Sequence, residues 1–161
     1  MKFMSWSARV AAVLALAAAS AVAADLPPLP QGLTAPAKPI KMQAFSLPTA
    51  AGGIAICVGE MPSVQRAQQE YQKSGVPVIA ISLDGDGAKS VKPFLSEHKY
   101  TLPVPLDPEM QFARSLGVRV TPWTVIIDRD GNLVGGGYGR IDMQSAEFRN
   151  YIKALAAKKP G

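Results

Sequence analysis

Cysteine is nearly absent from this 161-residue sequence, which contains only Cys57. A single cysteine cannot form an internal disulfide bond, so the folded chain must depend on its hydrophobic core. The thiol is then buried and unreactive, forms mixed disulfides, or pairs with another molecule. Histidine is equally scarce, with His98 alone. One cysteine, one histidine and scattered methionines do not make a set of metal ligands, and nothing in the sequence indicates a cofactor.

The sequence also lacks a strong excess of charge of either sign. It has 17 basic and 12 acidic residues, for a net charge of +5. The densest basic spot is the pair Lys158-Lys159 near the end of the chain. Charge this mild and scattered gives no reason to expect a nucleic-acid partner. The length suits a single domain with its own core.

Long apolar runs are missing outside residues 1–24. Lys2 and Arg9 precede an alanine- and leucine-rich run, and small residues follow it. This pattern predicts an export signal that is cleaved after Ala23 or Ala24. An uncleaved anchor is the less favoured alternative, because the run is short for a membrane span. We therefore expect a periplasmic or otherwise exported protein with no stable membrane span after cleavage.

The rest of the chain divides into a lead-in and one domain. Five prolines between residues 25 and 40 indicate an extended, polyproline-like lead-in with little reason to fold. Residues 41–158 are expected to form the domain. Its hydrophobic patterns predict strands over 41–47, 54–58, 76–83, 123–128 and 132–138, and helices over 61–74, 90–99, 109–116 and 143–158. This order describes an α/β fold with helices on both faces of a mixed sheet.

Two of these segments have distinctive expectations. The run from Ile54 to Val58 is continuously apolar, which is typical of a strand buried on both faces. In the helix over 90–99, Ser90 is the expected N-cap, and Pro93 falls within the first turn. The apolar residues of that helix are expected to face inward: Val91, Phe94 and Leu95. His98 extends the same face and is expected at the edge of the core rather than as a partner of Cys57.

Several short motifs occur in a characteristic order along the chain. They are Glu60-Met61-Pro62, Ile79-Ala80-Ile81-Ser82-Leu83-Asp84, Leu106-Asp107-Pro108, Ala113-Arg114-Ser115-Leu116-Gly117-Val118, and Thr121-Pro122 followed by Thr124-Val125-Ile126-Ile127-Asp128. As a set, from about Ala44 to Leu155, they resemble the TlpA/ResA branch of secreted thioredoxin-like thiol–disulfide oxidoreductases. The resemblance implies a thioredoxin-like fold, in which helices flank a central mixed β-sheet on both faces.

The sequence departs from this family at the active site. In the family a W-C-x-x-C turn leads into the redox helix, and its second cysteine lies three residues before the glutamate that Glu60 matches. Cys57 falls on that second position, and Ile54 stands where the nucleophilic cysteine belongs. A complete dithiol cycle needs one thiolate to attack and a second thiol to resolve the mixed disulfide. The resemblance therefore implies an oxidoreductase whose dithiol activity is impaired or lost.

Two gap placements explain this departure. In the first, Cys57 is a surviving resolving cysteine at the start of the redox helix, where the helix dipole would favour its thiolate, and the central strand has been lost. In the second, Ile54 to Val58 is the central strand, the turn with both cysteines has been lost, and Cys57 is a small buried hydrophobe. A sheet without its middle strand would leave unpaired backbone groups inside the protein, at about 1–3 kcal/mol each. The second placement is favoured for this reason.

The resemblance also assigns roles to other residues. Glu60 matches the carboxylate that tunes thiol acidity, although without a cysteine pair its simpler role is to accept backbone N–H bonds at a helix start. Thr121-Pro122 matches the cis-proline turn that faces the redox site and binds an extended substrate chain. Trp123 either fills the core or belongs to that peptide-facing surface. The implied partner is a thiol- or disulfide-bearing exported protein, or a small thiol.

Two functions remain open at this point. The chain is either an exported relative of these oxidoreductases in which Cys57 still reacts, or a redox-inactive module that binds a polypeptide through the Thr121-Pro122 surface. A poorly folded deletion remnant is a third interpretation. A one-cysteine peroxiredoxin is disfavoured because Pro48-Thr49 has the wrong spacing from Cys57. The glycine run 135–137 lies in a strand pattern and does not open a helix, so no phosphate site is expected there.

Overall fold

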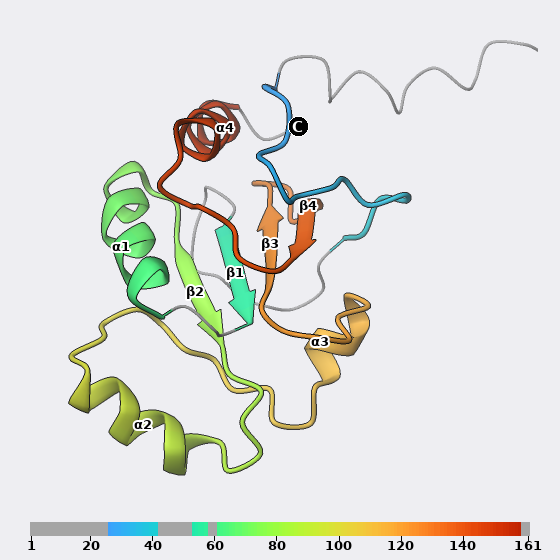
Figure 1. Cartoon of the computed structure of the whole chain (residues 1–161). Coiled ribbons are helices and arrows are strands. Elements are labelled where there is room, and N and C mark those ends of the chain that lie inside the picture. The colour runs from blue at the N-terminus through green and yellow to red at the C-terminus, as the bar shows by residue number, and fades with distance from the viewer. Residues whose placement is uncertain (1–25, 42–52, 58–60, 159–161) are drawn as a thin grey trace, which may run out of the picture.

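The computed structural model describes residues 26–41, 53–57 and 61–158, with the backbone alone described at 53–57. Within these residues, four strands form one sheet in the order β2-β1-β3-β4 (Figure 1). The strands are β1 Gly53–Cys57, β2 Val78–Ile81, β3 Trp123–Ile127 and β4 Leu133–Tyr138. The predicted strand over 41–47 lies outside the described residues beyond Lys41.

Strand β1 lies inside the sheet, because β2 pairs with one of its edges and β3 with the other. It runs parallel to β2, with Cys57 opposite Ile81, and antiparallel to β3, with Cys57 opposite Trp123. Strand β4 then pairs with β3 in the antiparallel sense, so the sheet is mixed. The prediction that the apolar run after Gly53 forms a central strand is confirmed through Cys57.

Four α-helices and one 3-10 helix surround the described sheet. They are α1 Met61–Tyr71, η1 Gln72–Ser74, α2 Ala88–Glu97, α3 Gln111–Ser115 and α4 Ala146–Ala157. Helix α1 continues into η1 and ends at Gly75, whose positive φ of 74° suits glycine at a helix C-terminus. None of the described helices is both long enough and apolar enough to cross a membrane.

The two faces of the sheet carry separate hydrophobic clusters. One cluster joins α1 and α4 to alternate residues of the strands, among them Val78, Ala80 and Ile126. The other joins α3 to the intervening residues, among them Ile79, Ile81 and Val125. This alternation follows from the two-residue period of a strand, and it places helices on both faces of the sheet.

Helix α4 matches its prediction closely. Ser145 caps it by accepting a hydrogen bond from the backbone N–H of Phe148 at 3.2 Å. Its buried residues are the four that the periodicity predicts: Phe148, Tyr151, Ile152 and Leu155. The Tyr71 hydroxyl donates a hydrogen bond to the carbonyl of Met143, just before this helix. Burial raises the pKa of Tyr71, so the hydroxyl keeps the proton that it donates.

Helix α2 differs from its prediction. Its N-cap is Gly87 and not Ser90, and Pro93 lies inside the helix rather than in the first turn. Gly87 adopts a φ of 56°, a conformation that favours glycine, and this lets the helix begin directly after the Asp84 turn. No residue of α2 is fully buried. Of Val91, Phe94 and Leu95, which were expected to face inward, Leu95 packs against the cluster beneath α1 and α4, Val91 is half-buried and Phe94 is exposed. His98 is likewise exposed.

The proline-rich lead-in, expected to be extended with little reason to fold, turns at residues 31–32 and packs on β4 (blue to cyan in Figure 1). Thr34 and Gly136 exchange two backbone hydrogen bonds of 2.9 Å each. The backbone N–H of Leu133 donates a third, also of 2.9 Å, to the carbonyl of Ile40. Leu33 is buried in the cluster beneath α1 and α4. This segment therefore gains the packing and hydrogen bonds that its sequence alone does not indicate.

The glycine run in β4 is explained by the same contact. A Cβ atom on Gly137 would lie 2.0 Å from the carbonyl oxygen of Gly32, and one on Gly135 would lie 2.9 Å from Leu29 Cδ2. A Cβ on Gly136 would have its nearest neighbour at 3.6 Å, an ordinary contact distance. Glycine is required at position 137 because the lead-in backbone lies directly against the strand.

We expect Gly137→Ala to lower the free energy of unfolding by about 1–3 kcal/mol, because the added methyl group displaces the lead-in backbone. Gly136→Ala is the matched control and should change it by less than about 1 kcal/mol, since its Cβ would meet other atoms only at ordinary contact distances of 3.6 Å or more. Urea unfolding followed by circular dichroism measures both. Equal destabilisation by the two substitutions would contradict the close approach of Gly32 to β4.

Candidate functional site

Cys57 is the last residue of β1, four positions before the start of α1 at Met61. Both residues opposite it, Ile81 and Trp123, pack in the cluster on the α3 face. Its backbone therefore belongs to a strand that is paired on both sides, and not to the first turn of a helix. Glu60 lies outside the described residues.

The Thr121-Pro122 turn lies at the same end of the sheet. The peptide bond between these residues is cis. The backbone N–H of Gly139 donates a 2.9 Å hydrogen bond to the carbonyl of Pro122, which ties the turn to the end of β4. Thr121 is exposed and Pro122 is half-buried. The turn is therefore fixed by the sheet while presenting Thr121 to solvent.

Trp123 combines the two roles that the sequence left open. It packs against the cluster on the α3 face, yet it is only half-buried. It is opposite Cys57 on one side and opposite Tyr138 on the other. The structure thus brings together, at one end of the sheet, four of the five residues that the sequence analysis selected: Cys57, Thr121, Pro122 and Trp123.

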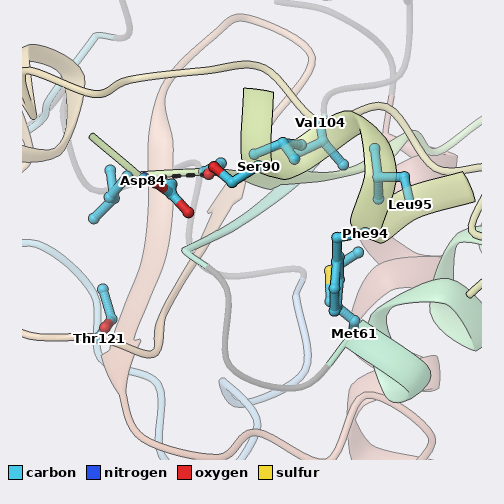
Figure 2. A pocket seen from close by; sticks show the side chains of 10 residues that line it. Met61, Asp84, Ser90, Phe94, Leu95, Val104 and Thr121 are labelled. Carbon is cyan, nitrogen blue, oxygen red and sulfur yellow. Dashed lines mark hydrogen bonds between the residues drawn. The ribbon is translucent and has the colours of Figure 1, made fainter. Parts of the chain in front are cut away.

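A cavity of about 450 Å³ opens beside this turn (Figure 2). It lies among the start of α1, the segment that follows β2, helix α2 and the Thr121 turn. Its polar lining residues are Ser82, Asp84, Ser90 and Thr121, and its apolar ones are Met61, Leu83, Val91, Phe94, Leu95 and Val104. The inward-facing residues of α2 line this cavity, and Leu95 also packs against the cluster beneath α1 and α4.

Two local networks hold the walls of the cavity. The Gln65 side chain is buried in α1, and its Oε1 accepts hydrogen bonds from the backbone N–H groups of Thr101 and Leu102 at 2.8 and 3.2 Å. This fixes the segment that leads to Val104. On the opposite side, the backbone N–H of Asp84 donates to Ser82 Oγ at 3.2 Å. Hydrogen bonds therefore hold the backbone segments on both sides of the cavity in place.

The cavity was not predicted from the sequence. Apolar residues at helical spacing in α2 predict an inward face, but they do not say whether that face meets other side chains or an open space. The sequence holds a weak indication of such a site, because two polar residues, Asp84 and Ser90, lie close together around the start of α2. No group of three histidine, cysteine or acidic side chains that could hold a metal ion occurs in the part of the chain that the structure describes.

The sheet order, the helices on both faces and the cis-proline turn at the sheet end define a protein of the thioredoxin-like class. The chain is similar to a putative thiol:disulfide interchange protein DsbE from Chlorobium tepidum, with a TM-score of 0.57 and 25% identity, over 66% of this chain and 82% of that one. A putative thiol-disulfide oxidoreductase from Bacteroides vulgatus, 16% identical, shares the fold over 81% of this chain and 97% of its own, with a TM-score of 0.57. The Redoxin family model matches residues 21–155, and the chain belongs to that family.

The curated relatives that the chain matches include ResA proteins. The thiol-disulfide oxidoreductase ResA of Halalkalibacterium halodurans is 28% identical over 101 residues, which are 62% of this chain and 57% of that protein. ResA of Oceanobacillus iheyensis is 34% identical over 103 residues, which are 64% of this chain and 52% of that protein. The matched region thus spans little more than half the length of these relatives. The TlpA/ResA-like resemblance seen in the sequence is confirmed.

The strand geometry predicts that Ile54→Cys will not create an internal disulfide, although it restores a C-x-x-C spacing. Residues three apart in a strand are about 10 Å apart, whereas the Cα atoms of a disulfide lie about 4.4–6.8 Å apart. Trp123→Cys is the matched control, because directly opposed antiparallel residues have Cα atoms about 4.5–5.5 Å apart.

Both variants should be oxidised and examined by intact mass and by alkylation of the remaining thiols. We expect an internal disulfide in Trp123→Cys and two free thiols in Ile54→Cys. An internal disulfide in the Ile54→Cys variant would instead place Cys57 in a turn at the helix start.

Proposed function

We propose that this chain is an exported redoxin of the ResA type that has lost dithiol exchange and retains a polypeptide-binding surface at the Thr121-Pro122 turn. One observation carries the proposal. The only cysteine of the sequence is the last residue of a strand that is paired on both edges. Cys57 is therefore a residue of the sheet, and not of a redox turn at the start of α1.

The chemistry of thiol–disulfide exchange explains why a single cysteine cannot complete the dithiol cycle. A thiolate attacks one sulfur of a disulfide, forms a mixed disulfide and releases the other sulfur as a thiolate. A second thiol in the same protein must then displace the product. With Cys57 alone, a mixed disulfide would persist until an external thiol removed it. In the proposed state Glu60 has no cysteine pair to tune, and its role is to accept backbone N–H bonds where α1 begins.

The proposed location and partner rest on the N-terminal pattern and on the family. Residues 1–24 have the features of an export signal with cleavage after Ala23 or Ala24. Relatives are named thiol-disulfide oxidoreductases, which act on thiol- or disulfide-bearing partners. We infer a periplasmic or otherwise exported protein whose partner is an exported polypeptide of that kind, or a small thiol if Cys57 still reacts.

The binding part of the proposal is supported by the exposed turn and the cavity next to it. Thr121 is exposed and also lines the cavity, so the turn and the cavity form one continuous surface. Trp123 supports the turn from within the sheet. A surface of this kind can bind an extended chain without any redox step.

Insulin reduction by dithiothreitol tests the loss of exchange. We expect the protein to accelerate insulin precipitation no more than its Cys57→Ala variant does, because neither has a dithiol. An active thioredoxin assayed in parallel shows that the conditions detect exchange. Acceleration by the wild-type protein that disappears in Cys57→Ala would contradict the proposal and assign the reaction to Cys57.

A further inference from the structure

We propose that the cavity beneath α2 is a specificity site for the bound polypeptide: it receives one apolar side chain, and Asp84 pairs with a basic residue beside it. This inference rests on the polypeptide binding proposed above and adds what that surface selects. It follows from the exposure of Phe94 on α2, from the distribution of polar and apolar groups around the cavity, and from the position of Thr121.

The apolar wall of the cavity is partly exposed to solvent. Phe94 keeps 40% of its surface exposed although it lines the cavity, and no residue of α2 is buried. In Figure 2, Phe94 and Met61 lie on the side of the cavity away from Asp84, and Leu95 and Val104 also line it. An apolar side chain placed against this wall would remove both its own surface and that of Phe94 from water, which favours binding.

The opposite side of the cavity is polar and carries a charged group. Among the described residues that line the cavity, Asp84 alone is ionisable, and it is exposed. Its Oδ1 accepts the backbone N–H of Asp86 at 3.0 Å, and a carboxylate has capacity for further donors. A lysine or arginine reaching this carboxylate would form a charge-assisted hydrogen bond, whereas an acidic residue would be repelled.

The position of Thr121 favours a polypeptide as the occupant. Figure 2 places Thr121 on the Asp84 side, across from Met61 and Phe94. Side chains of an extended chain alternate between its two sides, so a chain that crosses this turn can direct one side chain into the cavity and leave its neighbour near the rim. Since Thr121 and Phe94 are both exposed, the cavity is open beside the turn, which suits a side chain joined to a backbone outside.

Three fluorescein-labelled peptides test the site by fluorescence anisotropy. The first contains Gly-Ser-Leu-Lys-Ser-Gly, the second replaces leucine by alanine, and the third replaces lysine by glutamine. For the wild-type protein we expect Kd to rise at least fivefold with either replacement. In Asp84→Asn the preference for lysine over glutamine should disappear while that for leucine remains. In Phe94→Ala the preference for leucine over alanine should fall at least threefold.

Asp86→Asn is the matched control, because it removes a neighbouring exposed carboxylate that does not line the cavity. It should keep both preferences. Circular dichroism of each variant shows that it is folded, and Phe94→Leu provides a milder change of the same wall. The expected result is that charge selectivity follows Asp84 alone and apolar selectivity follows Phe94.

The outcomes that overturn the inference are distinct from those that overturn the proposed function. If all three peptides bind the wild-type protein equally, the turn binds polypeptides but the cavity selects nothing. If none binds at 1 mM, both the specificity site and the binding surface are refuted. If free leucinamide competes as well as the leucine peptide, the cavity is a small-molecule site. The loss of dithiol exchange is judged separately by insulin reduction.

Discussion

The pairing of β1 with a neighbour on each edge is the constraint on which the rest of the structure depends. Its backbone groups are committed to β2 on one side and β3 on the other, and removing it would leave unpaired groups inside the protein. Only residues 58–60 then connect Cys57 to the start of α1. None of these three residues is a cysteine, so the sequence that joins the strand to the helix holds no redox pair.

The proposed loss of the redox turn is compatible with the features that lie at the same end of the sheet. The cis Thr121-Pro122 turn is anchored by Gly139, and Trp123 connects it to β1 and β4. The cavity under α2 adjoins this turn. These features depend on the sheet and not on a thiol, so the proposed binding surface does not require the redox reaction.

The sequence predicts most of the described fold because the strong hydrophobic patterns coincide with buried elements. Strands β3 and β4 and helix α4 follow their predicted segments, and the placement of β1 follows from the cost of losing a middle strand. The positions of α2 and of the lead-in were not predictable in the same way. Their apolar residues, such as Phe94 and Leu33, have the same local pattern whether they face a core, a cavity or another strand. Gly137 indicates a close contact, but only the fold identifies Gly32 as its partner.

The most direct measurement is the accessibility of the Cys57 thiol in the folded protein. It is determined by maleimide labelling with and without denaturant across a pH series. If Cys57 is held in the central strand and takes no part in exchange, the thiol labels quickly only after denaturation, at every pH. Rapid labelling of the native protein, with a midpoint well below the pKa of about 8.5 of a free cysteine, would contradict this. It would show that Cys57 forms a reactive thiolate, and we would then assign the chain to the active oxidoreductases.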